Sequence, residues 1–418
     1  MGLGLPDLTS PFTLRKIMKR LALLLVSLLT ITPAAFADAL PAHFVITGSG
    51  YGHGVGLSQI GAKGMALEGK SASDILSYYF TGTTVAPVQD GADIRVNIGH
   101  KLTYLSLKAD KNSVSGIQLH QGELSGPLTQ IPLASTLKFA MVGKVISASI
   151  VTPKAATVVL PSGALWSLTW DGNLTVNKLV LKYGSVALRA VPITKSTPKI
   201  ELTTTMKLHD QYVYGVSEVS SSWPTAAMQA QAIATRTYAL TRMAKIRKDC
   251  DCNVYNTIYD QNYVGASKEL EATYGALWKA AVDSTTVDAT HGLAILYNGQ
   301  PINTFFSSSS GGVTANSVDV WGTAYPYLVS VPDPYSLDLV LNPTYSHWQR
   351  VINQADMAAA FSLNDVASLS IATRSPTNSA LTLLATSSAG ATSTLPVGTF
   401  KTKLKIPSSW FELASVGY

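Results

Sequence analysis

The feature that most restricts the fold is a series of short apolar or alternating segments between about residues 91 and 206, separated by Gly, Pro, Asn and Asp. Alternation with a period of two predicts half-buried strands, and short continuous apolar runs predict fully buried ones. The separating residues favour turns. We therefore predict strands in IRVNI, YLSLKA, GKVISASIVT, ATVVL, LWSLTW, KLVLKY and VALRAV.

The regions on either side combine helical and strand patterns, so the chain is predicted to have an α+β fold, with a mixed helix and strand core and a β-rich accessory region. Its 418 residues, of which 46% are hydrophobic and 13% charged, can bury one large core or several smaller ones. Ahead of the strands, Ser71 and Asp74 form a capping-box pattern, which predicts the start of a helix.

The N-terminus has the pattern of a secretory signal peptide. Basic residues precede the apolar run Leu21 to Leu29, and the small-residue pattern Ala35-Phe36-Ala37 follows it. We expect cleavage after Ala37 and export of the protein. An uncleaved membrane anchor is the alternative for the same segment.

Export would place the two cysteines, Cys250 and Cys252, in an oxidising compartment, where a disulfide between them is favoured. The alternative is half of a metal site. No histidine is close to them in the sequence, so a metal would need His209 or His291 brought in by the fold. We therefore predict a disulfide and no metal.

The charge balance argues against nucleic acid as a partner. The 31 basic and 25 acidic residues give a net charge of +6, without the Lys/Arg block typical of nucleic-acid-binding arms. Residues Gly64–Ser71 match the phosphate-loop pattern G-x-x-x-x-G-K-[ST], but a phosphate loop follows a buried strand. Here the interior Met-Ala-Leu-Glu favours a helix, and the preceding residues do not read as a strand. We therefore predict neither a nucleotide nor a cofactor.

Glu218 is a candidate general acid. It lies just before the longest predicted helix, which starts at Ser221-Ser222-Trp223-Pro224 with a capping serine and a proline in the first turn. Its neighbours are apolar or aromatic, and such surroundings raise the pKa of a carboxyl group by desolvation, as a general acid at neutral pH requires. Alternatively, Glu218 complements the positive end of the helix dipole, which would lower its pKa.

The segment around Glu218, YVYGVSEVSSSWPTAAMQAQAIATRTYAL, resembles the signature of the stage II sporulation protein D family (SpoIID/LytB). Other segments also resemble elements of this family: GYGHGVGLSQIGAKGMA, Asp260–Tyr263, Ala281–Val282 with Thr290 and Gly292, Ser307–Thr314, Trp321–Gly322, Pro326–Leu328 and Lys401–Phe411. The resemblance covers much of the chain after residue 37, and it is least defined between residues 91 and 206.

Two features depart from the family pattern. In sporulation members the H-G-x-G element follows the serine-glycine segment, whereas here it comes first, which resembles a circular permutation. If so, His53 should return in space to the site of Glu218. The residue before the serine run is Phe306, where many relatives are expected to have tyrosine, so a role that requires a phenol there is not open to this chain.

The resemblance implies lytic transglycosylase activity on peptidoglycan glycan strands, with Glu218 as general acid and then base. In this reaction the 6-hydroxyl of the sugar closes on its own anomeric carbon, so one carboxyl group suffices, whereas ordinary glycoside hydrolysis uses two. The acidic residues Asp210 and Asp260 lack a spacing that indicates a pair with Glu218. The alternative, implied by the LytB branch, is a non-catalytic glycan-binding protein that enhances a wall amidase.

Polar residues in the matching motifs are predicted to bind the glycan. Alternating glycines leave His53 and Gln59 as the largest polar groups of their segment, which suits close approach of a sugar chain; a satisfied histidine in a tight turn is the alternative. Arg236 either binds substrate or forms a structural ion pair. Trp223 or Tyr263 provides a stacking face or belongs to the core. The full predicted binding set is His53, Ser58, Gln59, Arg236, Asp260, Gln261, Ser309 and Thr314.

We divide the chain into five regions on these patterns. They are 1–37, a signal peptide; 38–90, the glycine-rich segment that completes the core; 91–206, the β-rich region; 207–335, a SpoIID-like catalytic core; and 336–418, the C-terminal part of the SpoIID-like domain.

Overall fold

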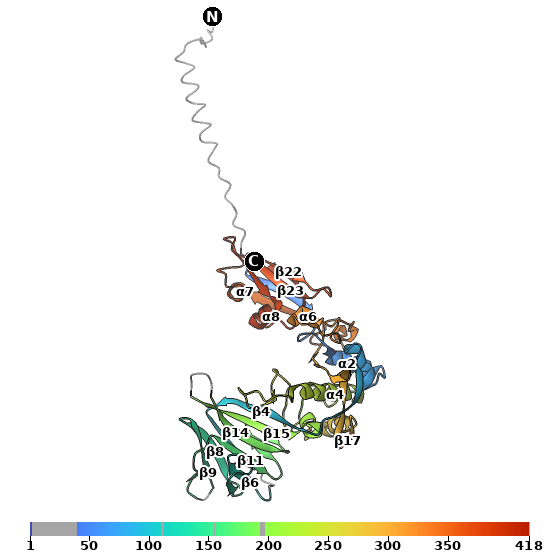
Figure 1. Ribbon diagram of the computed structural model, residues 1–418. Helices are drawn as coiled ribbons and strands as arrows, with labels where there is room; N and C mark the ends of the chain where they lie inside the picture. Colours follow the sequence, from blue (N-terminus) through green and yellow to red (C-terminus); the bar gives the residue numbers. More distant parts are fainter. Residues whose placement is uncertain (2–39, 110–112, 154, 193–196, 418) are drawn as a thin grey trace.

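The computed structural model describes residues 1, 40–109, 113–153, 155–192 and 197–417, and it has a mixed α+β architecture (Figure 1). The predicted α+β fold is thus confirmed. Apart from Met1, the predicted signal peptide lies outside the described residues. Among the residues that are described, no helix has both the length and the apolar character needed to cross a membrane.

The β-rich part consists of two sheets that pack on one core. One has the order β10 (Val158–Val159), β9 (Val145–Val151), β8 (Thr136–Val142), β5 (Tyr104–Ala109), β12 (Leu174–Val176) and β13 (Leu179–Leu181). The other has the order β16 (Val254–Tyr255), β4 (Asp93–Leu102), β15 (Lys199–Lys207), β14 (Ser185–Val191), β11 (Leu165–Trp170), β6 (Ile117–Gln121) and β7 (Leu128–Ile131). Every segment predicted as a strand contains one. Side chains of β9 alternate between the core and the outer face, whereas β11 buries three consecutive side chains.

The helical part is built around α4 (Thr225–Arg242), which contacts α2 (Gln59–Leu67), α3 (Ala72–Tyr79), α5 (Gly275–Asp283) and β18 (His291–Tyr297). The remaining short elements are β2 (Leu57–Ser58), β3 (Thr84–Gln89), the π-helix η1 (Leu208–Tyr212), β17 (Thr286–Asp288), β19 (Gln300–Pro301), β20 (Phe306–Ser307), α6 (Ser317–Trp321) and the 3-10 helix η2 (Pro334–Leu337). In Figure 1, α2 lies beside α4 although the two are far apart in the sequence.

Two predictions about helix starts had different outcomes. The capping box of α3 is confirmed, because the Asp74 amide donates to the Ser71 hydroxyl and the Ser71 amide donates to the Asp74 carboxylate. The prediction that a serine caps α4 is wrong. Pro224 occupies the N-cap position without a side-chain bond, and the Ser222 hydroxyl pairs with the Ser220 hydroxyl instead.

The C-terminal part forms a third unit that includes the first strand of the chain. β1 (His43–Ser49) lies between β21 (Trp348–Asn353) and β25 (Trp410–Gly417), antiparallel to both. The unit also contains α7 (Gln354–Phe361), β22 (Ser368–Arg374), β23 (Ala380–Thr386), β24 (Thr392–Pro396) and α8 (Val397–Leu404). Both ends of the described chain therefore meet in one sheet, and Figure 1 shows the blue strand among the red ones.

Three apolar cores correspond to these parts. The first joins the two large sheets to one face of α4 and to α5, and the second joins α2 and α3 to another face of α4. Trp223 and Phe305 pack against both of these cores. The residues just before α4 therefore lie where two cores meet, which is where Glu218 is found.

Candidate functional site

Glu218 lies in the irregular segment between η1 and α4, at the side of an open pocket of about 410 Å³. Hydroxyl, amide and charged groups are concentrated around this pocket. Its lining residues are Gln59, Ile60, Ser217, Glu218, Val219, Ser220, Ser221, Trp223, Lys268, Glu271 and Ser308. Such a surface offers many hydrogen-bonding groups and an indole face, as sugar binding requires.

Burial raises the pKa of the Glu218 carboxyl above its ordinary value of 4.5. One hydrogen bond opposes this effect, because the backbone N–H of Asn262 donates to Glu218 Oε1 at 2.7 Å and favours the charged form. Desolvation is the larger influence, so the pKa of Glu218 moves in the direction that a general acid needs rather than in the direction of the helix dipole.

The turn Asp260–Asn262 lies against the carboxyl of Glu218 and supplies the N–H that binds it. Asn262 makes two hydrogen bonds with the backbone of Ser217. The Ser217 amide donates to the backbone carbonyl of Asn262 at 2.8 Å, and the Ser217 carbonyl accepts from the side-chain Nδ2 of Asn262 at 2.9 Å. Gln261 is fully buried and accepts a hydrogen bond from the Tyr212 hydroxyl at 2.8 Å. Asp260 and Gln261 thus hold the turn, although both were predicted to bind glycan.

The glycine-rich segment reaches this site through Gln59. Its side-chain Nε2 donates to the backbone carbonyl of Glu218 at 3.2 Å and to Gln231 Oε1 of α4 at 3.3 Å. β2 pairs in parallel with β20, which places Gln59 and Ser308 at the same pocket. The early segment therefore lies against the segment that carries Glu218, as the permutation interpretation requires for this part of the chain.

His53 lies outside the lining of the Glu218 pocket. Its Nδ1 accepts the backbone N–H of Val55 at 3.0 Å, and its ring contacts those of Trp321 and Phe305, with centroids 5.1 and 6.2 Å away. Burial, with a smaller effect of Lys401, lowers the pKa of His53 to about 4, so the ring is neutral at pH 7. These contacts fit the alternative interpretation of His53, a histidine whose hydrogen bond is made within a tight turn, and not the predicted sugar-binding group.

The alternating glycines serve packing rather than approach of a ligand. A Cβ on Gly50, whose φ is +83°, would lie 2.7 Å from the amide nitrogen of Gly311. A Cβ on Gly56, whose φ is +73°, would lie 2.3 Å from the carbonyl oxygen of Phe305. The space above these glycines is therefore filled by the serine-glycine segment of the same chain, which corrects the interpretation that a sugar chain approaches there.

Three further predicted binding residues are buried supports. Ser58 is 1% exposed and caps α2, since its hydroxyl accepts the amide of Gly61 at 3.1 Å. Thr314 is 1% exposed, and its hydroxyl accepts the amide of Val331 at 2.8 Å. Ser309 is also 1% exposed and pairs through its backbone with Tyr51. With their hydroxyls inside the protein, these residues act on the site only through the backbone they fix.

Arg236 forms the structural ion pair and not the substrate contact. Its side chain is 0% exposed, with Nε 2.7 Å from Asp90 Oδ2. Three of its remaining N–H groups donate to the hydroxyl of Thr285 at 3.0 Å and to the carbonyl oxygens of His209 and Leu293 at 3.0 and 3.2 Å. A guanidinium enclosed in this way has no donor left at the pocket surface, so the predicted binding role of Arg236 is corrected.

Sequence reasoning missed two charged residues of the pocket. Lys268 is 6% exposed, its Nζ donates to the carbonyl of Val219 at 2.5 Å, and burial lowers its pKa. Glu271 is an exposed carboxylate at the same pocket. Neither lies in a recognisable motif, because the stretch SKELEA reads as an ordinary polar segment. Trp223 lines the pocket, whereas Tyr263 is buried.

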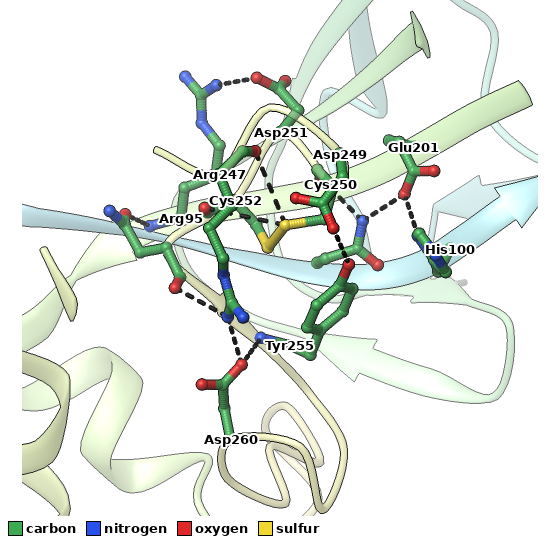
Figure 2. Close-up of a disulfide and its surroundings, with 12 residues drawn as sticks. Arg95, His100, Glu201, Arg247, Asp249, Cys250, Asp251, Cys252, Tyr255 and Asp260 are labelled. Atoms are coloured by element: carbon green, nitrogen blue, oxygen red, sulfur yellow. Dashed lines mark hydrogen bonds and ion pairs between the residues drawn. A yellow bond between two sulfur atoms is a disulfide. The ribbon is translucent and has the colours of Figure 1, made fainter. Parts of the chain in front are cut away.

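Cys250 and Cys252 form a disulfide (Figure 2). The metal alternative is not supported, because His209 pairs with Asp90 and His291 pairs with Asp288. Within the part of the chain that the structure describes, no group of three or more His, Cys, Asp or Glu side chains is arranged to hold a metal. The segment that matches the phosphate-loop pattern is not a loop at its start, since Gly64 to Leu67 lie within the helix α2.

Comparison with known proteins identifies the segment that carries Glu218. Residues 196–297 match the family model for stage II sporulation protein, SpoIID. This segment of the chain belongs to the SpoIID family. The SpoIID segment includes Glu218, Lys268 and the turn Asp260–Asn262, whereas Gln59 and Ser308 come from outside it.

Individual relatives agree with this assignment. Stage II sporulation protein D of Bacillus subtilis is 33% identical over 133 residues, which are 30% of this chain and 38% of that protein. The amidase enhancer of the same organism is 32% identical over 117 residues, 28% of this chain and 14% of that protein. An uncharacterized protein of Brachyspira hyodysenteriae is 36% identical over 124 residues, 29% of this chain and 31% of that protein. The matches therefore span no more than about two fifths of any of these relatives.

Proposed function

We propose that this protein is an exported cell-wall protein that cleaves peptidoglycan glycan strands as a lytic transglycosylase. The observation that carries the proposal is the carboxyl of Glu218, which has a pKa raised by burial and lies at an open polar pocket with an indole on its wall. Membership of the SpoIID family and the names of the relatives support a role at the cell wall. Export is part of the proposal and rests on the signal-peptide pattern of residues 1–37.

In the proposed reaction, the protonated Glu218 donates its proton to the glycosidic oxygen as the bond to the anomeric carbon breaks. The 6-hydroxyl of the same sugar attacks the anomeric carbon, and its proton passes to the Glu218 carboxylate. The products are a 1,6-anhydro sugar end and a free hydroxyl on the leaving sugar, with Glu218 protonated again. Water is not consumed, so no second carboxyl group is required.

Glu271 makes simple hydrolysis the competing chemistry, because a second carboxylate at the pocket could activate water. Its exposed position distinguishes it from the half-buried Glu218. Hydrolysis would leave a reducing end, whereas the transglycosylase leaves an anhydro end. The product therefore decides between the two reactions.

The test is to digest purified glycan, with and without stem peptides, and to analyse the products by mass spectrometry. We expect 1,6-anhydro ends from the wild-type protein, a loss of roughly 10²–10⁴-fold in Glu218→Gln, and retained activity in Glu271→Gln. Reducing ends, or a Glu218→Gln protein that cuts at the wild-type rate, would contradict the proposal.

A second candidate function rests on the relative named amidase enhancer. In that case the pocket binds glycan and a wall amidase is the partner. The protein would yield no glycan fragments by itself, and it would increase the rate of a wall amidase equally well as wild type and as Glu218→Gln. Assaying both proteins with the amidase separates this function from the first.

A further inference from the structure

Both carboxylate oxygens of Asp260 are used inside the protein. Oδ1 accepts the hydroxyl of Tyr238 at 2.8 Å. Oδ2 accepts the backbone amide of Tyr255 at 2.8 Å and pairs with the guanidinium of Arg247. The Asp260 side chain is 3% exposed, so it presents no free oxygen to a ligand. Its bonds instead connect three parts of the chain at one point.

Arg247 reaches Asp260 from the disulfide loop. The backbone of Arg247 exchanges hydrogen bonds with Cys252, at 2.7 and 3.3 Å, and the disulfide closes the loop between them. The guanidinium also donates to the carbonyl of Asn253 at 3.0 Å and lies over the ring of Tyr255. Figure 2 shows the disulfide, Arg247, Tyr255 and Asp260 as one connected group.

The same turn ends at the candidate general acid. Asn262, two residues after Asp260, donates its backbone N–H to Glu218 Oε1 at 2.7 Å. Two residues span at most about 7 Å of extended chain, so a displacement of Asp260 is transmitted to Asn262. Ser217 also holds Asn262, so the ion pair between Asp260 and Arg247 is one of the contacts that fix this N–H.

We propose that Asp260 is a positioning residue for Glu218, held in place by Arg247 and the Cys250–Cys252 loop. It acts through the turn that carries the N–H of Asn262 and does not contact substrate. The inference concerns the proposed catalytic site and extends the proposed function by naming what fixes its carboxyl group. Its first test does not require catalysis.

The first test is a ¹³C NMR titration of the Glu218 carboxyl in the full chain. The N–H of Asn262 stabilises the carboxylate, so a displaced N–H raises the pKa of Glu218 further. We expect Asp260→Asn and Arg247→Gln each to raise this pKa, and the double variant to raise it no more than the larger single effect, because the two residues act as one unit. An unchanged pKa in folded Asp260→Asn overturns the proposal.

The loop provides a matched control. Asp251 lies between the two cysteines and pairs with Arg95 and Arg189, each at 2.9 Å. In Figure 2 its carboxylate lies on the opposite side of the disulfide from Asp260. Asp251→Asn therefore removes a carboxylate of the same loop without touching the turn, and we expect the pKa of Glu218 to stay at the wild-type value. A shift as large as that of Asp260→Asn would show a general effect of the loop and overturn the proposal.

The disulfide gives a route that does not depend on any substitution at the turn. We expect reduction of the wild-type protein to raise the pKa of Glu218 in the same direction, because the loop that carries Arg247 is then no longer closed by the disulfide. If Asp260→Asn does not fold, Arg247→Gln and reduction decide the question, since the Arg247 side chain is 36% exposed and tolerates change more readily. No shift in either would overturn the inference.

Where the wild-type protein cleaves glycan, kinetics provide a second test. A displaced general acid lowers kcat by about ten- to a hundredfold while KM changes little. The alkaline limb of the kcat/KM profile moves to higher pH with the pKa of Glu218. A merely structural role would lower the amount of active protein without moving this limb. Absence of product from the wild-type protein would refute the proposed function, and the NMR titration would still decide the inference.

Discussion

At the scale of single residues, the surroundings of His53 keep its imidazole ring neutral. His53 is half-buried beside the rings of Phe305 and Trp321, and its Nδ1 accepts the amide of Val55. Lys401 of α8 lies close enough to oppose protonation of the imidazole. The neutral ring thus satisfies its surroundings, whereas the protonated ring would be a cation in an apolar site beside another cation.

This environment predicts a loss of stability in mild acid. The pKa of His53 is 6.5 in the exposed chain and about 4 in the folded protein, so unfolded molecules bind the proton first as the pH falls. The stability due to neutral His53 is complete above pH 6.5 and is lost between there and pH 4. From pH 7 to pH 5, the free energy of unfolding should fall by about 2 kcal/mol more in wild type than in His53→Gln.

Urea denaturation at the two pH values measures this difference. His347→Gln, on an exposed side chain, is the matched control and should leave the wild-type difference unchanged. An equal fall in wild type and His53→Gln would show that His53 is protonated as readily in the folded protein as in the unfolded one.

At the scale of elements, the packing of α2 explains a segment that matches a phosphate-binding pattern. Gly64 lies inside this helix, and a Cβ there would be 2.3 Å from Cδ1 of the Tyr335 ring in η2. The hydroxyl of Tyr335 donates to Glu68 at 2.6 Å, which limits how far the ring can move. The glycine is thus required where two elements approach closely, and the lysine of the pattern, Lys70, is exposed after the helix.

Gly64→Ala tests this explanation. In an open helix the change would stabilise the protein by about 1 kcal/mol, because alanine favours helix. Here the contact with Tyr335 should outweigh that gain, and we expect a net destabilisation of about 1–2 kcal/mol by denaturant unfolding. Lys70→Met, at the residue a phosphate loop could not lose, should change stability by less than about 0.5 kcal/mol. A stabilised Gly64→Ala protein would contradict the packing argument.

The elements also show what the sequence could predict. Apolar and alternating patterns located β4, β5, β9, β10, β11, β13 and β14 but not β6, β7, β8 and β12. The capping box located α3. Both kinds of pattern depend on near neighbours. The N-cap of α4 was predicted wrongly because the helix begins only after Pro224, so the serines lie outside its N-cap position. Glu218 was singled out as a candidate by its apolar neighbours, and its proposed role came from the resemblance of its segment to the SpoIID signature. Lys268 was missed because its burial comes from a chain segment about 50 residues away, whose carbonyl it binds at Val219.

At the scale of the whole molecule, the order of segments along the chain differs from their order in space. The motif resemblance identified Gln59 as a candidate site residue but did not show that it contacts Glu218. No local pattern indicates that β1 pairs with β21 and β25. These pairings join residues about 300 to 370 positions apart. Ala42 donates its amide to the carbonyl of Gly417 at 2.6 Å, so both ends of the described fold are neighbours in an antiparallel ladder.

This adjacency predicts that the chain can be reconnected. A two-residue Asn-Gly turn from Gly417 to Ala42 would convert β25 and β1 into a β-hairpin. Opening the chain between Gly91 and Ala92 would then place the H-G-x-G element after the serine-glycine segment, the order that the family resemblance implies for sporulation proteins. We expect this permuted protein to fold with the wild-type circular dichroism spectrum and with an unchanged pKa of Glu218.

The permuted protein should be less stable, by about 1–3 kcal/mol, because the new ends lie beside Asp90, the buried partner of Arg236. A permutant with the same new turn, opened instead at the hairpin between Gly143 and Lys144, separates the two effects. Its ends lie far from Asp90 in the sequence, so the loss of stability should be smaller. If both permutants fail to fold, the hairpin connection is wrong, and the early segment cannot be regarded as a rearranged C-terminal one. If only the first fails, the connection is correct and the ion pair between Asp90 and Arg236 needs the continuous chain.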